Sequence, residues 1–105
     1  MGSRTAAFEE NFAELTGSKH AIAVANGTAA IHLALLGLGI GSSQADEVIQ
    51  PAINFVAGAN MTIAVGARPV FADIVSLTEP SMDPGKVEEL VTPHTKAVMV
   101  MHYGG

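Results

Sequence analysis

Hydrophobic positions along the chain follow two periods, and these predict alternating helices and strands. In residues 6–15 the apolar side chains recur at helical spacing among glutamates, which predicts an amphipathic helix that ends at Gly17. In residues 28–38 only Thr28, at the start, and His32 are polar. That pattern predicts a second helix, apolar all round and therefore buried on most sides.

Short apolar runs bounded by turn residues predict buried strands. The predicted strands are residues 20–25, 46–51, 68–74 and 96–103, and the helices between the later ones are residues 54–67 and 81–91. Asp83 is expected to cap the last helix, with Pro84 in its first turn. Helices that alternate with apolar strands indicate an α/β fold, a mostly parallel sheet covered by helices. We expect Asp46, Glu47 and Asp73, at strand ends, to face solvent.

The composition suggests that this chain belongs to a larger folded body or to an oligomer. Its 105 residues are at most one domain, yet 49% are hydrophobic and only 14% are charged. A small domain with so few charges tends to associate, so we expect a larger folded body or an oligomer to cover part of its surface.

Charge and cysteine content exclude several classes of function. The formal net charge of −5 repels a polyanion, so no nucleic acid is expected as a partner. The sequence has no cysteine, which fits a reducing compartment, and the cytoplasm is the expected location. Its apolar runs are too short for a membrane span, and no signal peptide is expected. The four histidines lack metal-site spacing, so no metal is expected.

The segment Asn26-Gly27-Thr28 is the strongest local candidate for chemistry. It joins a predicted strand to a predicted helix, so the free N–H groups of the helix start lie at the carboxyl edge of the sheet. Gly27 lets an anion approach the backbone, and the Thr28 hydroxyl offers a further donor. The alternative is a plain turn with Thr28 as helix cap. The segment matches neither the three-glycine dinucleotide motif nor the nucleotide-triphosphate loop.

Three further side chains have both a functional and a structural interpretation. Phe55 follows the strand that ends at Pro51, where its ring could stack on a planar cofactor or simply belong to the core. Asn60 needs a partner if it is buried, and a structural role is favoured. His102 lies at the end of the last predicted strand, at the sheet edge where ligands of α/β proteins bind, but need not line a pocket.

Several motifs in series closely resemble the DegT/DnrJ/EryC1/StrS family of sugar aminotransferases. They are the Gly-Thr-Ala turn at 27–29, the Pro-x-x-x-Phe-Val segment at 51–56, the strand at 66–74, the Thr-Pro-x-Thr-Lys-Ala segment at 92–97 and the closing segment at 102–105. The likeness runs over nearly the whole chain. Because five motifs occur in order, it carries more weight than any one of them.

The resemblance implies a pyridoxal-phosphate-dependent enzyme of fold type I that works as a dimer with active sites near the subunit interface. By resemblance, Gly27, Thr28 and Ala29 would hold the cofactor phosphate, and the ring of Phe55 would stack on the pyridine. The substrates implied are an amino acid, commonly glutamate, and a nucleotide-linked keto sugar.

The resemblance also implies that residues 1–105 are an N-terminal, incomplete part of the cofactor-binding large domain. The family's Schiff-base lysine comes later than the closing segment, and Lys19, Lys86 and Lys96 do not match it. No catalytic residue is therefore assigned, and the chain by itself is expected to be inactive. Two alternatives are a stand-alone binder of phosphate or cofactor without catalysis, and a truncated relic that survives as an oligomer.

Overall fold

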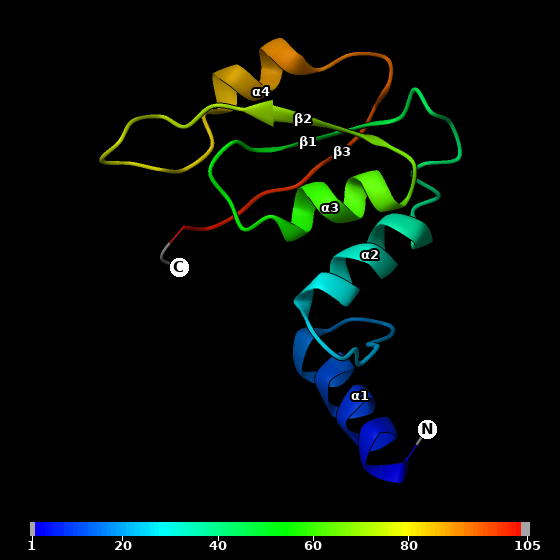
Figure 1. The fold of residues 1–105 in the computed structure, drawn as a ribbon. Helices are drawn as coiled ribbons and strands as arrows, with labels where there is room; N and C mark the ends of the chain where they lie inside the picture. Colours follow the sequence, from blue (N-terminus) through cyan, green and yellow to red (C-terminus); the bar gives the residue numbers. More distant parts are fainter. Residues whose placement is uncertain (1, 104–105) are drawn as a thin grey trace.

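Seven elements follow one another in the computed structural model, which describes residues 2–103. They are α1 (Ser3–Thr16), α2 (Gly27–Gly37), β1 (Glu47–Pro51), α3 (Ala57–Ala64), β2 (Arg68–Ala72), α4 (Pro84–Leu90) and β3 (Thr95–Val98). From β1 onward, strands and helices alternate, as the sequence pattern predicts (Figure 1).

The sheet is fully parallel and has the order β2-β1-β3 in the described chain. In the β1–β2 pair, Glu47 lies opposite Arg68 and Pro51 opposite Ala72. Every residue of β1 is buried because this strand has a neighbour on both sides and helices over its faces. The predicted α/β fold with a parallel sheet is confirmed.

Helices lie on both faces of the sheet. Figure 1 shows α4 above the strands and α3 below them, with α2 next to α3. The core on the α2–α3 side is built around Val48, Leu35 and Ile40, with Met61 and Met99 packed against it. This packing holds the N-terminal ends of α2 and α3 near the same edge of the sheet.

The predicted helix ends are mostly confirmed. Gly17 ends α1 with a left-handed φ of 67°, a conformation that glycine adopts without a steric penalty. Asp83 caps α4 by accepting hydrogen bonds from the N–H groups of Gly85 (2.7 Å) and Lys86 (3.4 Å). Pro84 occupies the first helical position, where no N–H donor is needed.

The predicted strand at residues 20–25 is wrong. This segment has no strand conformation and lies beside α1, away from the sheet (Figure 1). A strand needs a neighbouring strand for its backbone hydrogen bonds, and within residues 2–103 none runs beside it. It is held instead by one side chain: the N–H of Ala23 donates to Oε1 of Glu9 at 2.7 Å.

The prediction that the second helix is buried on most sides is also wrong for the described chain. Only Leu35 of α2 is buried, whereas Leu33 and Leu36 are exposed. The helix packs against α3 and the core on one side, and Ala30, Leu33 and Leu36 are exposed within residues 2–103. The apolar surface of α2 is therefore larger than the part that residues 2–103 cover.

Asp46 and Glu47 are buried, contrary to the prediction, whereas Asp73 is exposed as predicted. Asp46 accepts hydrogen bonds from the N–H groups of Gly41 (2.9 Å) and Ser43 (3.4 Å). The Glu47 carboxylate pairs with Arg68 and accepts a 2.7 Å hydrogen bond from the Thr92 hydroxyl. These partners satisfy the buried charges, and two of them lie far away in the sequence.

The remaining differences concern the lengths of elements. The helix predicted at 54–67 begins only at Ala57, which leaves Phe55 in the preceding loop. The last strand spans only Thr95–Val98. Within residues 2–103, no helix is both long and apolar enough to span a bilayer.

Candidate binding site at the start of two helices

Asn26 sets the geometry of the α2 start. Its Oδ1 accepts a hydrogen bond from the N–H of Ala29 at 2.9 Å, and its backbone carbonyl accepts one from Ala30 at 3.1 Å. Asn26 is therefore the N-cap, and the alternative in which Thr28 caps the helix is wrong. Thr28 is the second helical residue and is half-buried.

The structure brings three of the sequence-predicted residues together around one cavity. This cavity has a volume of about 460 Å³. Its lining comprises Gly27, Thr28 and Ile31 from α2, Asn54 and Phe55 from the β1–α3 loop, and Ala57 and Gly58 from α3. Residues almost 30 positions apart meet because α2 and α3 pack side by side. The sequence had indicated Gly27, Thr28 and Phe55, but not the α3 residues.

Backbone N–H groups are the main polar groups that the α2 start offers to a ligand. The N–H groups of Gly27 and Thr28 have no acceptor within residues 2–103. Free N–H groups at the positive end of a helix dipole are a general feature of anion-binding sites in proteins. The third predicted donor, Ala29, already donates to Asn26.

Gly27 is not required by the packing of the chain itself. A Cβ at this position would meet no other atom within 4 Å, and φ at Gly27 is not positive. Neither steric crowding nor backbone conformation therefore explains a glycine here. The space in front of the Gly27 backbone is open, and a side chain at this position would fill it.

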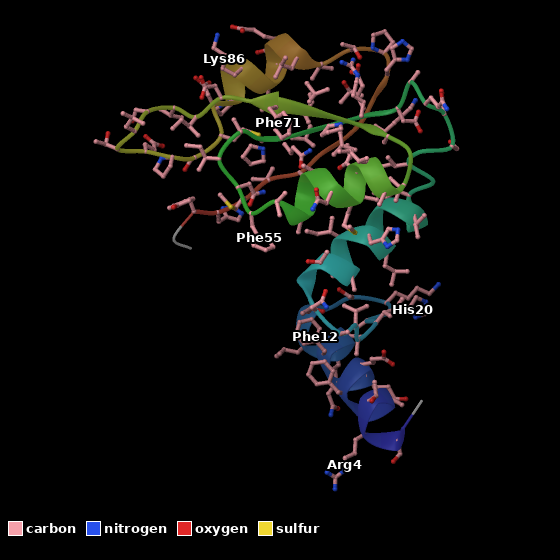
Figure 2. The ribbon with its side chains drawn as sticks, viewed as in Figure 1. Arg4, Phe12, His20, Phe55, Phe71 and Lys86 are labelled. Atoms are coloured by element: carbon pink, nitrogen blue, oxygen red, sulfur yellow. The ribbon has the colours of Figure 1, made fainter. Side chains whose placement is uncertain are left out.

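Phe55 lies on the other side of the cavity. Its side chain is 75% exposed and projects from the loop between β1 and α3 (Figure 2). The preceding residue, Asn54, fixes this loop because its Oδ1 accepts a 2.7 Å hydrogen bond from the N–H of Phe55. An exposed ring opposite a set of N–H donors suits a ligand with a flat ring and an anionic group.

The other sequence candidates lie apart from this cavity. Asn60 is exposed on α3, so it needs no buried partner. His102 lines a different cavity of about 320 Å³, between β3 and α4. Lys86 lies on α4 across the sheet and pairs with Glu89 at 2.9 Å. Among residues 2–103, no charged side chain lines the cavity of Gly27 and Phe55.

Comparison with known proteins decides the family. The model of the DegT/DnrJ/EryC1/StrS aminotransferase family matches residues 1–105. The chain belongs to this family. Because the match includes the Gly27–Thr28 turn and the Phe55 loop, the residues that form the cavity lie within the part that family members share.

Two curated family relatives are similar over most of the chain. The spore coat polysaccharide biosynthesis protein SpsC of Bacillus subtilis is 49% identical over 104 residues, which are 99% of this chain and 26% of SpsC. The GDP-perosamine synthase of Caulobacter vibrioides is 48% identical over 98 residues, 93% of this chain and 26% of the synthase. The chain thus spans about a quarter of the length of these relatives.

A solved structure shows the same fold. The PLP-form of the putative sugar aminotransferase Spr1654 from Streptococcus pneumoniae matches with a TM-score of 0.84 at 30% identity. The match covers 93% of this chain and 24% of that chain. The arrangement of β1, β2 and β3 with their helices is therefore one that aminotransferases contain.

Proposed function

We propose that this chain is the N-terminal part of the cofactor-binding large domain of a sugar aminotransferase that uses pyridoxal phosphate. The observation that carries the proposal is the shared cavity of Gly27, Thr28 and Phe55. It combines the free N–H donors of Gly27 and Thr28 with an exposed aromatic ring, and pyridoxal phosphate combines a phosphate with a planar pyridine. The residues present therefore fit this cofactor.

Each residue has a defined role in this proposal. The N–H groups of Gly27 and Thr28 and the Thr28 hydroxyl donate to the phosphate, and Gly27 leaves room for it. Ala29 contributes its N–H when a phosphate oxygen replaces Oδ1 of Asn26 as the acceptor. The ring of Phe55 would stack on the pyridine.

The bound cofactor would supply an electron sink for moving an amino group between two carbon skeletons. In the proposed reaction the amino group comes from an amino acid, glutamate, and passes to a keto sugar linked to a nucleotide. The support is that the family consists of aminotransferases and that two similar proteins are named for polysaccharide and perosamine synthesis. A cytoplasmic homodimer is part of the same proposal.

The proposal is tested by substitutions at the start of α2. Gly27→Val places a side chain in the phosphate position, and Thr28→Val removes the hydroxyl at nearly constant volume. A hydrogen bond to a charged group contributes about 1.5–3 kcal/mol, so Thr28→Val should weaken cofactor binding by about tenfold or more. Gly27→Val, which obstructs the phosphate position, should weaken it at least as much. Asn60→Ala, outside the cavity, is the control and should leave binding unchanged.

The measurement uses the chain fused to the remainder of SpsC, so that the domain is complete. Pyridoxamine phosphate is the titrant because it has no aldehyde to react with surface lysines. Thermal unfolding without cofactor identifies any variant that merely damages the helix. If both valine variants bind within twofold of the unsubstituted protein, Gly27 and Thr28 form only a turn.

A further inference from the structure

The N–H group of Ala29 has two acceptors that exclude each other. In the structure it donates to Oδ1 of Asn26 at 2.9 Å. In the proposed function the same N–H donates to the phosphate of the cofactor. A single N–H makes one well-aligned hydrogen bond, since the bond weakens steeply when it is bent. The Asn26 side chain therefore has to leave before Ala29 can bind the phosphate.

The Asn26 side chain can leave while the helix stays closed. Asn26 is exposed, so water can solvate the released carboxamide. Its backbone carbonyl accepts the N–H of Ala30 at 3.1 Å, and this first helical hydrogen bond does not involve the side chain. A phosphate oxygen is also the stronger acceptor for Ala29, because a hydrogen bond to a charged group is roughly twice as strong as a neutral one.

The other two donors of the α2 start are not occupied in this way. The N–H groups of Gly27 and Thr28 have no acceptor within residues 2–103. A phosphate therefore meets two free donors and a third that must first be released from Asn26. The release costs one neutral hydrogen bond, which corresponds to a factor of about two to ten in an equilibrium constant.

We propose that Asn26 sets the cofactor affinity of this site as an internal competitor of the phosphate. It caps α2 in the empty protein, and it lowers the affinity for a phosphate monoester by the strength of that cap. This role rests on the proposed function, because the phosphate must bind at the start of α2. Its consequence is a reversed effect: removing this polar side chain should strengthen cofactor binding, whereas removing a side chain that binds the cofactor weakens it.

Asn26→Gly tests this role in the chain fused to the remainder of SpsC. Glycine is nearly as favourable as asparagine at an N-cap, so α2 should begin at the same residue. The substitution leaves the N–H of Ala29 without an acceptor, and a phosphate can then bind it without displacing a cap. Pyridoxamine phosphate should bind about two- to tenfold more tightly than it binds to the unsubstituted protein.

Asp83→Gly is the matched control. Asp83 caps α4 by the same kind of bond, to the N–H groups of Gly85 and Lys86, and it does not line the cofactor cavity. Removing this cap should change the affinity for pyridoxamine phosphate less than twofold. A gain in affinity that is confined to Asn26→Gly therefore does not come from a general loosening of the helices.

Asn26→Asp is a second variant that keeps the cap. Aspartate caps a helix about as well as asparagine, so the fold should be unchanged. Its negative charge, however, lies where a phosphate oxygen has to bind. The affinity for pyridoxamine phosphate should fall by about tenfold or more.

Hydrogen exchange at Ala29 separates competition from a purely structural cap. In the empty protein the Ala29 N–H should exchange faster in Asn26→Gly than in the unsubstituted protein, because its acceptor is gone. With saturating pyridoxamine phosphate the two proteins should exchange at the same slow rate, because the phosphate is the acceptor in both. A cap that stays in place would preserve the difference in the loaded proteins.

The failure of this role and the failure of the proposed function give different results. If pyridoxamine phosphate causes no saturable shift of the Gly27 and Thr28 N–H signals, the proposed function fails and the role of Asn26 fails with it. If these signals shift but Asn26→Gly binds no more tightly than the unsubstituted protein, only the role of Asn26 is overturned. If Asn26→Gly does not fold, unchanged affinity in a folded Asn26→Asp variant overturns it.

Discussion

Replacing Gly41 by alanine should strongly destabilise the contact that ties the α2–β1 loop to the end of α3. Gly41 has a φ of 91°, which residues with a side chain rarely adopt. A Cβ at this position would be 1.8 Å from the backbone oxygen of Val65. An ordinary contact begins at 3.4 Å, so the two segments would have to separate by about 1.6 Å.

The expected cost follows from these two features. A non-glycine residue in a sparsely populated backbone region costs about 1–3 kcal/mol. Forcing extra volume into a packed contact costs about 1–3 kcal/mol more. Gly41→Ala should therefore lower the free energy of unfolding by about 2–6 kcal/mol, which corresponds to a fall in Tm of about 10 °C or more for a chain of this size.

The assay is thermal and urea unfolding followed by circular dichroism. Gly37→Ala is the matched control, because Gly37 ends α2 without a positive φ and with no atom within 4 Å of an added Cβ. That control should be neutral or slightly stabilising, since alanine favours the helix. A Gly41→Ala variant whose Tm stays within about 3 °C of the unsubstituted chain would refute the reasoning.

Two further predictions concern acid stability and association. The hydrogen bond from Thr92, and then Arg68 by hydrogen bond and charge, hold the pKa of Glu47 below its ordinary value of 4.5, although desolvation opposes them. The stability contributed by this carboxylate is present above pH 4.5 and is lost as the pH falls through the lowered pKa. In urea unfolding between pH 7 and 3, the free energy of unfolding should therefore fall less in the Glu47→Gln variant than in the unsubstituted chain. An equal fall in the two proteins would contradict this. Because Leu15 and Leu36 are 82% and 53% exposed, the chain should also self-associate, and a monomer in sedimentation at micromolar concentration would contradict that.

The sequence predicted local features more reliably than those that depend on distant partners. The start of α4 was predictable because Asp83 and Pro84 act within one helical turn. β1 was predictable because a short apolar run between turn residues suits a central strand. The burial of Glu47 was missed because Arg68 and Thr92, which satisfy its charge, lie 21 and 45 residues away.

In the candidate site, too, local features were predicted and contacts between distant residues were missed. Gly27, Thr28 and Phe55 were identified because each lies in a recognisable segment. The role of Asn26 as cap was missed, although asparagine before a helix is a common cap and was a usable signal. The close approach of the Gln50 side chain to Gly58 has no local signal, because it arises from the packing of β1 against α3. The segment 20–25 has the composition of a strand, but composition does not supply a neighbouring strand.

The most direct test of the central claim is to locate pyridoxamine phosphate on the chain. In the ¹⁵N-labelled chain, fused to the remainder of SpsC, titration should shift the N–H signals of Gly27 and Thr28 in a saturable way. Magnetisation transfer should also be seen between the pyridine protons of the ligand and the ring of Phe55. Saturable binding that leaves Gly27, Thr28 and Phe55 unaffected, or no binding at all, would contradict the account.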